Sequence, residues 1–383
     1  VLITSFCPKS RYLKIAETPG QFGSLVPGVF IPLIIVWVIT LGVLFKGVKK
    51  GIEAANKIFL PALFVLFLII VIRAVTLDGA VEGLNAFFKP NWDVIMNGKV
   101  WVAAYGQIFF SLSIAFAIMV TYSSYLPKKS DITNNAFITG FANSGFELLA
   151  GIGVFSILGF MAVQQGVGVD EVVSGGVGLA FVVFPQIINQ FPAFNEFFGF
   201  LFFGSLILAG LTSLISIVET FVAGVQDKFN LSRTKSVAVG GGLAAIISIM
   251  FATQGGLYFL DVVDYFINNF GVALAGLIEV VAIAWFAKEL KSLQQHADSV
   301  SDMKLGAWWR ICLSIITPIV LGYMMFDNIR TNINENYEGY ATGFVIAYGW
   351  VVAIAVIIVG VLFSFVKWNK PSLEVKDSEE VSK

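Results

Sequence analysis

The sequence predicts an all-α protein that crosses a membrane many times. Of its 383 residues, 57% are hydrophobic and only 13% are charged, whereas about a quarter of the residues in a soluble domain are charged. The mean hydropathy is +0.85, and several uncharged stretches are long enough to cross a bilayer as helices. Helices are the expected spanning elements because they satisfy their own backbone polar groups, which lipid cannot do.

Nine largely apolar stretches of the chain are predicted to span the membrane, and four of them carry one or two charged residues. The nine predicted spans are Gly28–Phe45, Ile58–Leu77, Val100–Leu126, Ile132–Ala162, Phe197–Val225, Ser236–Ala252, Val262–Phe286, Ile311–Phe326 and Ala341–Phe365. Residues 1–27 mix polar residues with proline and glycine and are predicted as an extracellular loop. Residues 28–366 then form the transmembrane domain, and the charged residues 367–383 form a cytoplasmic tail.

The stretch Val172–Asn195 is also uncharged, but it contains three glycines and two prolines that argue against a continuous helix. If it does not span, 17 of the 24 basic residues lie on one side of the membrane and 7 on the other. If it spans, this ratio inverts, and the basic early loops 46–57 and 128–129 fall on the side that is poor in positive charge. Residues 172–195 are therefore predicted as an extracellular hairpin, with the N-terminus outside and the C-terminus in the cytoplasm.

Several classes of protein are not supported by the composition. The net charge is −1, the two cysteines lie far apart, and the single histidine lies in a charged loop, so neither nucleic-acid binding nor a disulfide framework nor a histidine metal site is expected. The chain carries no pattern of a nucleophile with a base and no phosphate-binding loop, so an enzyme with an organic cofactor is not expected. It begins with Val1 and shows no signal peptide, so we expect an N-terminal truncation.

The most informative stretch is Gly106–Phe116, which lies in the middle of a predicted span. It carries Ser111 and Ser113, flanked by Phe110 and Phe116. The two hydroxyls could bond back to carbonyls one turn earlier, which is the better interpretation if they are taken alone. The alternative is that the helix breaks near residues 111–115, so that its freed backbone groups and hydroxyls hold a solute and an ion.

Two other predicted spans carry polar groups at helical spacing. Asn143 and Glu147 are four residues apart and share one helix face, while Ala209, Thr212 and Ser213 share a face of a later helix. Such residues also serve as interhelical contacts or allow close packing, although a glutamate in mid-span is a functional candidate by default. Hydroxyl, amide and carbonyl oxygens are hard ligands, and so few neutral ones fit sodium better than a divalent ion.

The order and spacing of three segments resemble those of the neurotransmitter:sodium symporters, a family that includes bacterial leucine transporters. The segments are Trp101–Tyr125, Leu208–Ile217 followed by Asp227–Arg233, and Asp261–Glu279. The resemblance covers nearly all of residues 28–366 and matches family helices four to twelve only. It implies part of the family's five-plus-five inverted repeat, with the broken helix at 101–125.

The resemblance also implies a role for individual residues. Those that match the substrate site are Phe110, Ser111, Ser113, Phe116, Ser213 and Ile217. Those that match sodium ligands are Ser111 and Asn143 at the first site and Ala209, Thr212 and Ser213 at the second. The matching gate residues are Gln107, Asp264 at the outer gate, and Tyr125 and Asp227 at the inner gate. Glu147 stands where chloride-dependent members have serine, which implies chloride independence.

The resemblance therefore implies a symporter in the plasma membrane that couples sodium to an amino acid or a related small solute by alternating access. Two departures from the family pattern bear on this. Ala115 and Ala117 replace residues that are often glycine, and family helices one to three, which supply further ligands, are absent from the chain. A non-transporting homologue and an inactive truncated form remain the alternatives.

Overall fold

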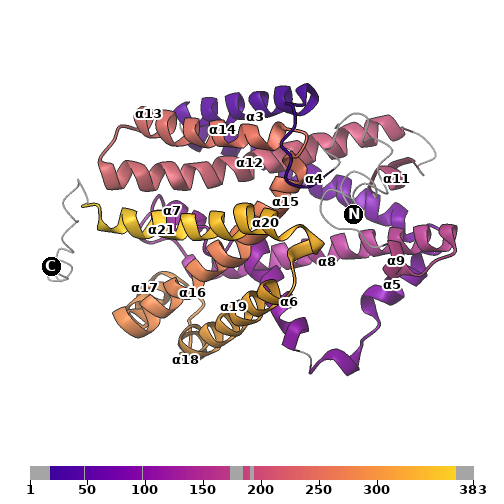
Figure 1. Ribbon diagram of the computed structural model, residues 1–383. Coiled ribbons are helices and arrows are strands. Elements are labelled where there is room, and N and C mark those ends of the chain that lie inside the picture. Colours follow the sequence, from indigo (N-terminus) through magenta and orange to yellow (C-terminus); the bar gives the residue numbers. More distant parts are fainter. Residues whose placement is uncertain (1–17, 47, 97, 173–183, 190–193, 368–383) are drawn as a thin grey trace.

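The structure is a computed structural model that describes residues 18–46, 48–96, 98–172, 184–189 and 194–367 (Figure 1). Within these ranges the chain is helical, with one isolated bridge between Leu25 and Thr253. Residues 1–17 of the predicted loop, most of the predicted hairpin 172–195 and residues 368–383 of the predicted tail lie outside the described residues.

The first half of the chain leads up to the longest helix. Its elements are α3 (Pro27–Lys46), α4 (Val48–Val75), α5 (Ala80–Phe88), η1 (Trp92–Val94), α6 (Gly98–Ser111), α7 (Ile118–Ser123), α8 (Ile132–Gln165), α9 (Val169–Val172), α11 (Phe184–Asn189) and α12 (Asn195–Phe229). In Figure 1, α12 runs below α3 and α14, while α8 and α5 lie toward the right of the view.

The second half folds into continuous helical stretches that contain π-helical or 3₁₀ turns. The first is α13 (Arg233–Ser236), η3 (Val237–Gly241), α14 (Gly242–Ser248) and η4 (Ile249–Ala252). The second is α15 (Gly256–Phe266), η5 (Ile267–Val272), α16 (Ala273–Val281) and η6 (Ala282–Ala287), followed by the separate helix α17 (Leu290–Val300). The last two are α18 (Ala307–Ile311), η7 (Cys312–Ile316) and α19 (Thr317–Asn334), then, after η8 (Tyr337–Gly339), α20 (Thr342–Val345), η9 (Ile346–Trp350) and α21 (Val351–Phe365).

The helices lie at the positions of the predicted spans, although not all of them are long enough to cross a membrane. Seven stretches in the described chain are long and apolar enough to cross a membrane, and the bent pair 60–75 and 80–94 would make an eighth. The predicted span 100–126 is split into α6 and α7, neither of which is long enough alone. The polytopic all-α prediction is confirmed, and the count of nine stays a prediction.

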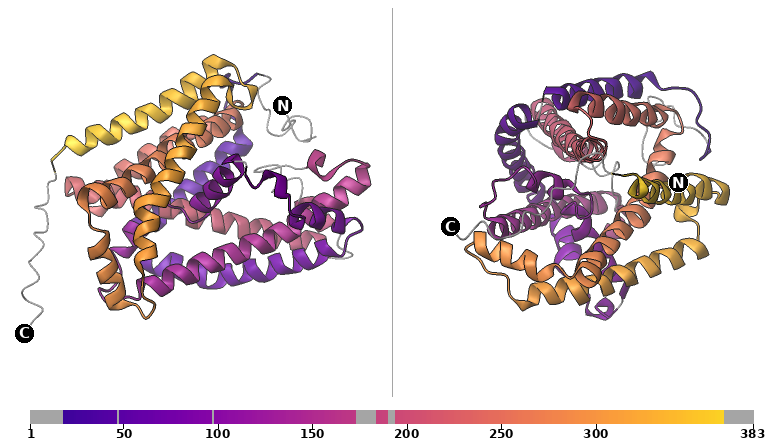
Figure 2. Two further views of the ribbon diagram at one scale, coloured as in Figure 1. Left: turned by 90° about the horizontal axis from the view of Figure 1, so that it is seen from below. Right: turned by 90° about the vertical axis from the view of Figure 1, so that its left-hand side faces the viewer.

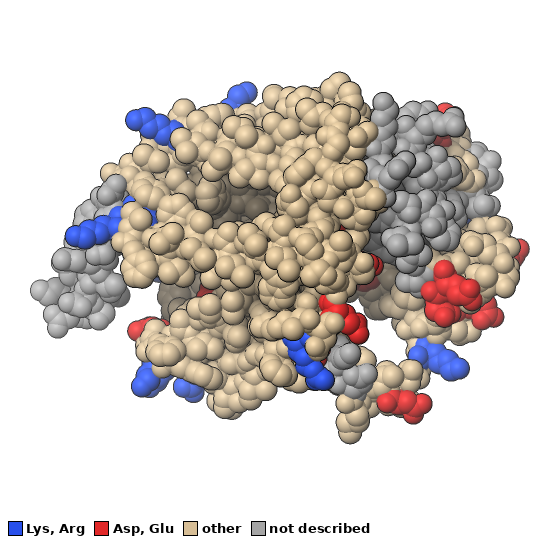
Figure 3. All heavy atoms as spheres, in the orientation of Figure 1, with Lys and Arg blue, Asp and Glu red and all other residues tan. Residues whose placement is uncertain are grey.

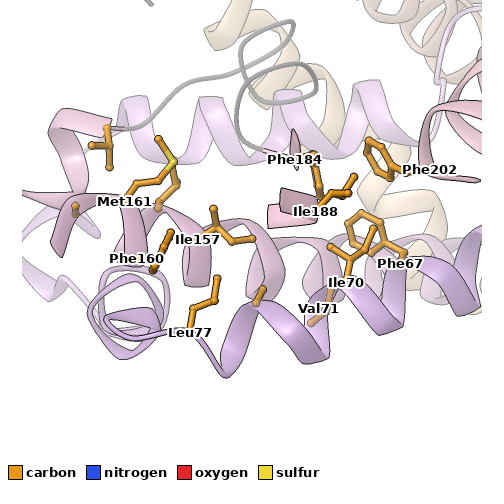
Figure 4. Packing of buried hydrophobic residues seen from close by; sticks show 14 of the residues in the cluster. Phe67, Ile70, Val71, Leu77, Ile157, Phe160, Met161, Phe184, Ile188 and Phe202 are labelled. Atoms are coloured by element: carbon orange, nitrogen blue, oxygen red, sulfur yellow. The ribbon is translucent and has the colours of Figure 1, made fainter. Parts of the chain in front are cut away.

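Three hydrophobic clusters hold the helices together. In the first, Phe67 and Ile70 of α4 pack against Ile157 of α8 and Phe202 of α12 (Figure 4). In the second, α6 packs against α15, α16, α19 and α20–η9, and this cluster supports the interrupted helix. In the third, α3 packs against α12 and η3. Figure 2 shows α15–α21 on one side of the molecule and α4, α5 and α8 on another.

The surface is consistent with a position in a bilayer. Figure 3 shows a broad uncharged area with charged side chains at its margins. Most of the Lys and Arg side chains on this face lie toward the end where α13 begins, and most Asp and Glu side chains lie toward the opposite end. Large apolar side chains are exposed over much of the described surface, among them Ile138 and Leu362, as expected of helices that face lipid.

Candidate functional site

The predicted break between residues 101 and 125 is present, and its geometry follows from how α6 ends. The N–H of Ile114 donates to the carbonyl of Phe109, and the N–H of Ser113 donates to that of Phe110. These two bonds, with Ser113 at a φ of 52°, form the Schellman arrangement that ends many helices. The residue in the left-handed position is usually glycine, so the serine there is strained.

The chain between α6 and α7 stays irregular for several residues. Ala115 and Ala117 also have positive φ values, of 66° and 55°, which is rare for residues with a Cβ. The next backbone bond described after Ile114 is that from Thr121 to the carbonyl of Ala117. The N–H groups of residues 115–117 therefore donate to no backbone acceptor in the described chain, and they are available to a bound solute.

The strain at Ala117 leads to a testable prediction. Ala117 is exposed and makes no helical bond that depends on its methyl group, so Ala117→Gly should raise the free energy of unfolding by about 1 kcal/mol. Denaturant unfolding in detergent micelles measures the change. The matched control is Ala104→Gly, inside α6, which should lower the same quantity by about 1 kcal/mol. Equal changes in both variants would contradict the strained conformation.

A glycine of α16 allows the break to lie close to the second core. A Cβ on Gly276 would be 2.6 Å from the Cζ atom of Phe109 and 3.1 Å from the Cβ atom of Ala115. Phe109 is buried with 6% of its surface exposed, so its ring cannot move aside. The position of residues 109–115 is thus determined by the direct approach of α16.

The predicted substrate residues on α6 and beyond come together at the break. Phe110 and Phe116 meet edge to face with ring centroids 5.9 Å apart, which walls one side of the irregular segment. Asn143 of α8 donates to the Oγ atom of Ser111 at 3.2 Å. The hydroxyl of Ser111 also donates weakly to the carbonyl of Ile108 at 3.4 Å. The two predicted ligands of the first sodium ion are therefore neighbours.

The predicted ligands on α12 lie within one turn of each other. Thr212 donates its hydroxyl proton to the carbonyl of Ala209 at 2.8 Å, so the two oxygens lie near enough to share one small cation. Ser213 and Ile217 are exposed on this helix. No hydrogen bond is described between either residue and residues 110–116, so their place in one substrate site stays a prediction.

Two tyrosines place α7 alongside α12. Tyr122 donates to the Oγ atom of Ser216 at 2.6 Å, and Tyr125 donates to Oε1 of Glu219 at 3.2 Å. Both pairs are 94 residues apart in sequence, so the two helices run parallel in one register. If this alignment is extended one turn toward the start of both helices, the beginning of α7 lies level with Thr212, next to the predicted sodium ligands.

An ion pair with a buried carboxylate lies at the end of this contact. Glu219 has 1% of its side chain exposed and makes a bidentate pair with Arg233, with oxygen–nitrogen distances of 2.9 and 2.8 Å. The Nε atom of Arg233 also donates to the carbonyl of Leu44 in α3. Sequence reasoning did not assign these two residues a role. The sequence did contain a signal for this pair, because a single acid inside an apolar helix needs a cationic partner.

Two further predicted residues lie near groups already described. Asp227 is exposed two turns beyond Glu219, and its charge acts electrostatically on Tyr125. Glu147 is half-buried on α8, one turn beyond Asn143. It therefore shares a helix face with the asparagine that contacts Ser111.

A cavity of about 560 Å³ lies along the second half of α6, between this helix, α15–η5 and α19, and reaches Phe110 beside the break. It is lined by the predicted outer residues Gln107, Phe110 and Asp264, together with Asp327 and Asn328 of α19. The carboxylate of Asp264 accepts a hydrogen bond from Asn268 at 2.9 Å. The structure thus brings Phe110, a predicted substrate residue, and the predicted gate residues Gln107 and Asp264 together around one cavity.

A second acid of α15 fastens the loop that follows α19. Asp261 accepts a hydrogen bond from Tyr340 at 2.8 Å and one from Tyr337 at 3.2 Å, one on each oxygen. Burial, and then the hydrogen bond to Asp261, raise the pKa of Tyr340. This phenol therefore stays protonated as a donor through the physiological range, and the loop stays attached beside the cavity.

Comparisons with known proteins agree with this arrangement. A model of the sodium:neurotransmitter symporter family matches residues 8–371. An uncharacterized sodium-dependent transporter of Methanocaldococcus jannaschii is 38% identical over 346 residues, which are 90% of this chain and 70% of that protein. The sodium- and chloride-dependent neutral and basic amino acid transporter B(0+) of Homo sapiens is 30% identical over 85% of this chain and 52% of its own length.

A glycine transporter provides a third comparison. The sodium- and chloride-dependent glycine transporter 2 of Xenopus laevis is 32% identical over 83% of this chain and 40% of its own length. The chain therefore spans about half the length of these animal relatives, and more of the archaeal one. The family match and the apolar helices make it a multi-pass membrane protein. This chain belongs to the sodium:neurotransmitter symporter family, whose members are transporters and not enzymes.

Proposed function

We propose that this protein is a symporter that couples the inward movement of sodium to that of an amino acid or a related small solute. The observation that carries the proposal is the break after Ser111, whose free backbone groups lie in register with the hydroxyl and carbonyl oxygens of α12. A broken helix beside oxygen ligands is the arrangement that secondary transporters use to bind ion and solute at mid-membrane. The chain would correspond to family helices four to twelve, and so to part of the family's five-plus-five inverted repeat.

Sodium would occupy two sites. At the first, Ser111 would offer its hydroxyl and Asn143 its amide oxygen, and the two side chains are neighbours because the amide nitrogen of Asn143 donates to Oγ of Ser111 at 3.2 Å. At the second, the carbonyl of Ala209 and the hydroxyls of Thr212 and Ser213 are the ligands. These neutral oxygens suit a monovalent hard cation. No organic cofactor is part of the proposal.

The solute would bind where the chain between α6 and α7 is unwound. Phe110 and Phe116 would cover its apolar part, Ser111 and Ser113 would bind its polar end, and residues Ser213 and Ile217 would close the pocket from α12 when the helices move. Relatives named for amino acids support this class of solute. Solute release would alternate between the outer cavity at Gln107 and Asp264 and the inner contact at Tyr125, with Asp227 nearby.

Two finer features complete the proposal. Glu147 would supply the fixed negative charge that chloride supplies in chloride-dependent members, so transport would not need chloride. The basic end of the molecule would face the cytoplasm of a plasma membrane together with the C-terminus, and the N-terminus of this chain would lie outside, as the charge distribution favours. A membrane chaperone or sensor with the same fold would bind the solute without accumulating it.

Uptake into vesicles tests the proposal. The full-length gene product, reconstituted in liposomes, should accumulate a radiolabelled amino acid only with an inward sodium gradient, and equally well when gluconate replaces chloride. Thr212→Ala should raise the sodium concentration for half-maximal uptake by about tenfold, because it removes an ion ligand whose loss costs about 1.4 kcal/mol. Asn143→Ala should act in the same direction.

The control for this test is Thr220→Ala on the same helix. Thr220 makes the same kind of bond to the backbone, to the carbonyl of Ser216 at 2.9 Å, but lies two turns beyond the proposed ligands. The sodium concentration for half-maximal uptake by Thr220→Ala should equal that of the unaltered protein. Uptake that persists without sodium would reject the coupling, and binding without accumulation would favour the non-transporting alternative.

A further inference from the structure

We propose that Tyr122 and Ser216 are positioning residues that link the proposed second sodium site to the inner half of the broken helix. In this arrangement, an ion on the turn 209–213 of α12 holds α7 in place through a chain of hydroxyl groups. The inference rests on the proposed function and extends it to two residues for which no role has been given above.

The link consists of three hydrogen bonds that meet at Thr212. The phenol of Tyr122 donates to Oγ of Ser216 at 2.6 Å, and this hydroxyl in turn donates to the backbone carbonyl of Thr212 at 3.0 Å. The side-chain hydroxyl of Thr212 donates to the carbonyl of Ala209 at 2.8 Å. The carbonyl and the hydroxyl belong to one residue, so α7 is connected to the ligand turn through Thr212.

Tyr122 and Ser216 lie between the proposed ion site and the contact that holds α7 on α12. Tyr122 and Ser216 are both half-buried, so water competes only weakly for their bond. The pair lies one turn from the ligands on one side and one turn from the Tyr125–Glu219 contact on the other. It is therefore positioned between the ion site and the inner end of the molecule.

Ion binding must change this chain. A sodium ion takes the lone pairs of Ala209 and Thr212, so the hydroxyl proton of Thr212 has to leave the carbonyl of Ala209. The turn then adjusts around the ion, and the carbonyl of Thr212, which holds Ser216, adjusts with it. A hydrogen bond as short as that of Tyr122 transmits such a shift because its length can change little.

The reverse effect follows from linkage. If sodium favours the docked position of α7, then docking of α7 must favour sodium binding to the same degree. Removing the phenol hydroxyl should therefore weaken sodium binding, although Tyr122 itself does not touch the ion. A residue that only stabilised the fold would leave the sodium affinity of the folded protein unchanged.

The experiment measures sodium affinity in the full-length gene product. Tyr122→Phe and Ser216→Ala each remove the same bond, so either remains informative if the other fails to fold. We expect each to raise the sodium concentration for half-maximal uptake by about fivefold, the effect of one net hydrogen bond. The double variant should show no larger shift than Ser216→Ala alone, because that change already removes the bond from Tyr122 together with the bond to the carbonyl of Thr212.

The matched control is Tyr105→Phe. Tyr105 lies on the outer half α6 and donates to Oγ1 of Thr317 at 3.2 Å, so the control removes a phenol hydroxyl from the same broken helix on the other side of the break. Its half-maximal sodium concentration should equal that of the unaltered protein. An equal shift in Tyr105→Phe would overturn the specific link.

A second measurement follows the position of α7 directly. In a background in which Cys7 and Cys312 are replaced by serine, maleimide labelling of Ser123→Cys should be slowed by sodium, because Ser123 is exposed on α7. The Tyr122→Phe change should abolish most of this protection. Sodium-dependent uptake combined with unchanged affinity and protection in the variant would overturn the inference alone, whereas absence of any sodium response in the unaltered protein would overturn the proposed function with it.

Discussion

Replacing Arg233 with leucine is expected to lower the free energy of unfolding by about 3 kcal/mol. The reason is that Glu219, with 1% of its side chain exposed, would keep its charge but lose both guanidinium contacts. Tyr125 would remain as its single described donor. The bond to the carbonyl of Leu44 would also be lost. Denaturant unfolding in detergent micelles measures the change.

The double variant Glu219→Leu with Arg233→Leu should recover most of this loss. Removing both charges leaves no uncompensated ion, and apolar replacements of a buried pair are often neutral. The control is Lys235→Leu, an exposed residue of the same short helix, which should change the stability by less than about 0.5 kcal/mol. If the double variant does not recover the lost stability, Arg233 acts through the carbonyl of Leu44 and not through the carboxylate of Glu219.

The substitution Gly276→Ala is expected to have the second large effect. The added methyl group would lie 2.6 Å from the ring of Phe109 and 3.1 Å from Ala115, so the break would have to shift. Overpacking of this kind costs about 1–3 kcal/mol, and we expect sodium-dependent uptake to fall by about tenfold or more. Initial uptake rates, normalised to the amount of folded protein, measure the effect.

The same helix offers a matched control and a rescue. At Gly271 the nearest atom to an added Cβ is 3.8 Å away, which is an ordinary contact, so Gly271→Ala should leave uptake unchanged. Adding Phe109→Leu to Gly276→Ala removes the ring that the methyl group meets and should restore part of the uptake. Full activity of Gly276→Ala alone would contradict the close approach of α16 to the break.

The positions of the helices could be predicted from the sequence because the bilayer imposes one simple requirement. An apolar stretch in lipid has to satisfy its backbone internally, so the predicted spans, from Gly28–Phe45 to Ala341–Phe365, coincide with helices in the structure. Their exact lengths could not be predicted. The bend between Val75 and Ala80 and the five π-helical turns of the second half depend on contacts between helices.

The break near residues 111–115 was predicted from the two hydroxyl groups between aromatic rings together with the family resemblance, because the hydroxyls taken alone favoured bonds back to their own helix. Its geometry was not, because the left-handed conformations of Ala115 and Ala117 contradict local preference. They persist where Gly276 brings α16 against the chain. Likewise, nothing in the sequence pairs Asp261 with Tyr340, which lies 79 residues later.

The sequence by itself therefore determined that this protein is an all-helical membrane protein with an interrupted helix and a small set of polar residues at helical spacing. These features are local, and they follow from hydropathy and periodicity along a single segment. Only the tertiary structure decided which polar groups meet: Ser111 with Asn143, Tyr122 with Ser216, and Glu219 with Arg233. Pairing depends on helix register and on close approach between segments far apart in the chain, and hydropathy carries no information about either.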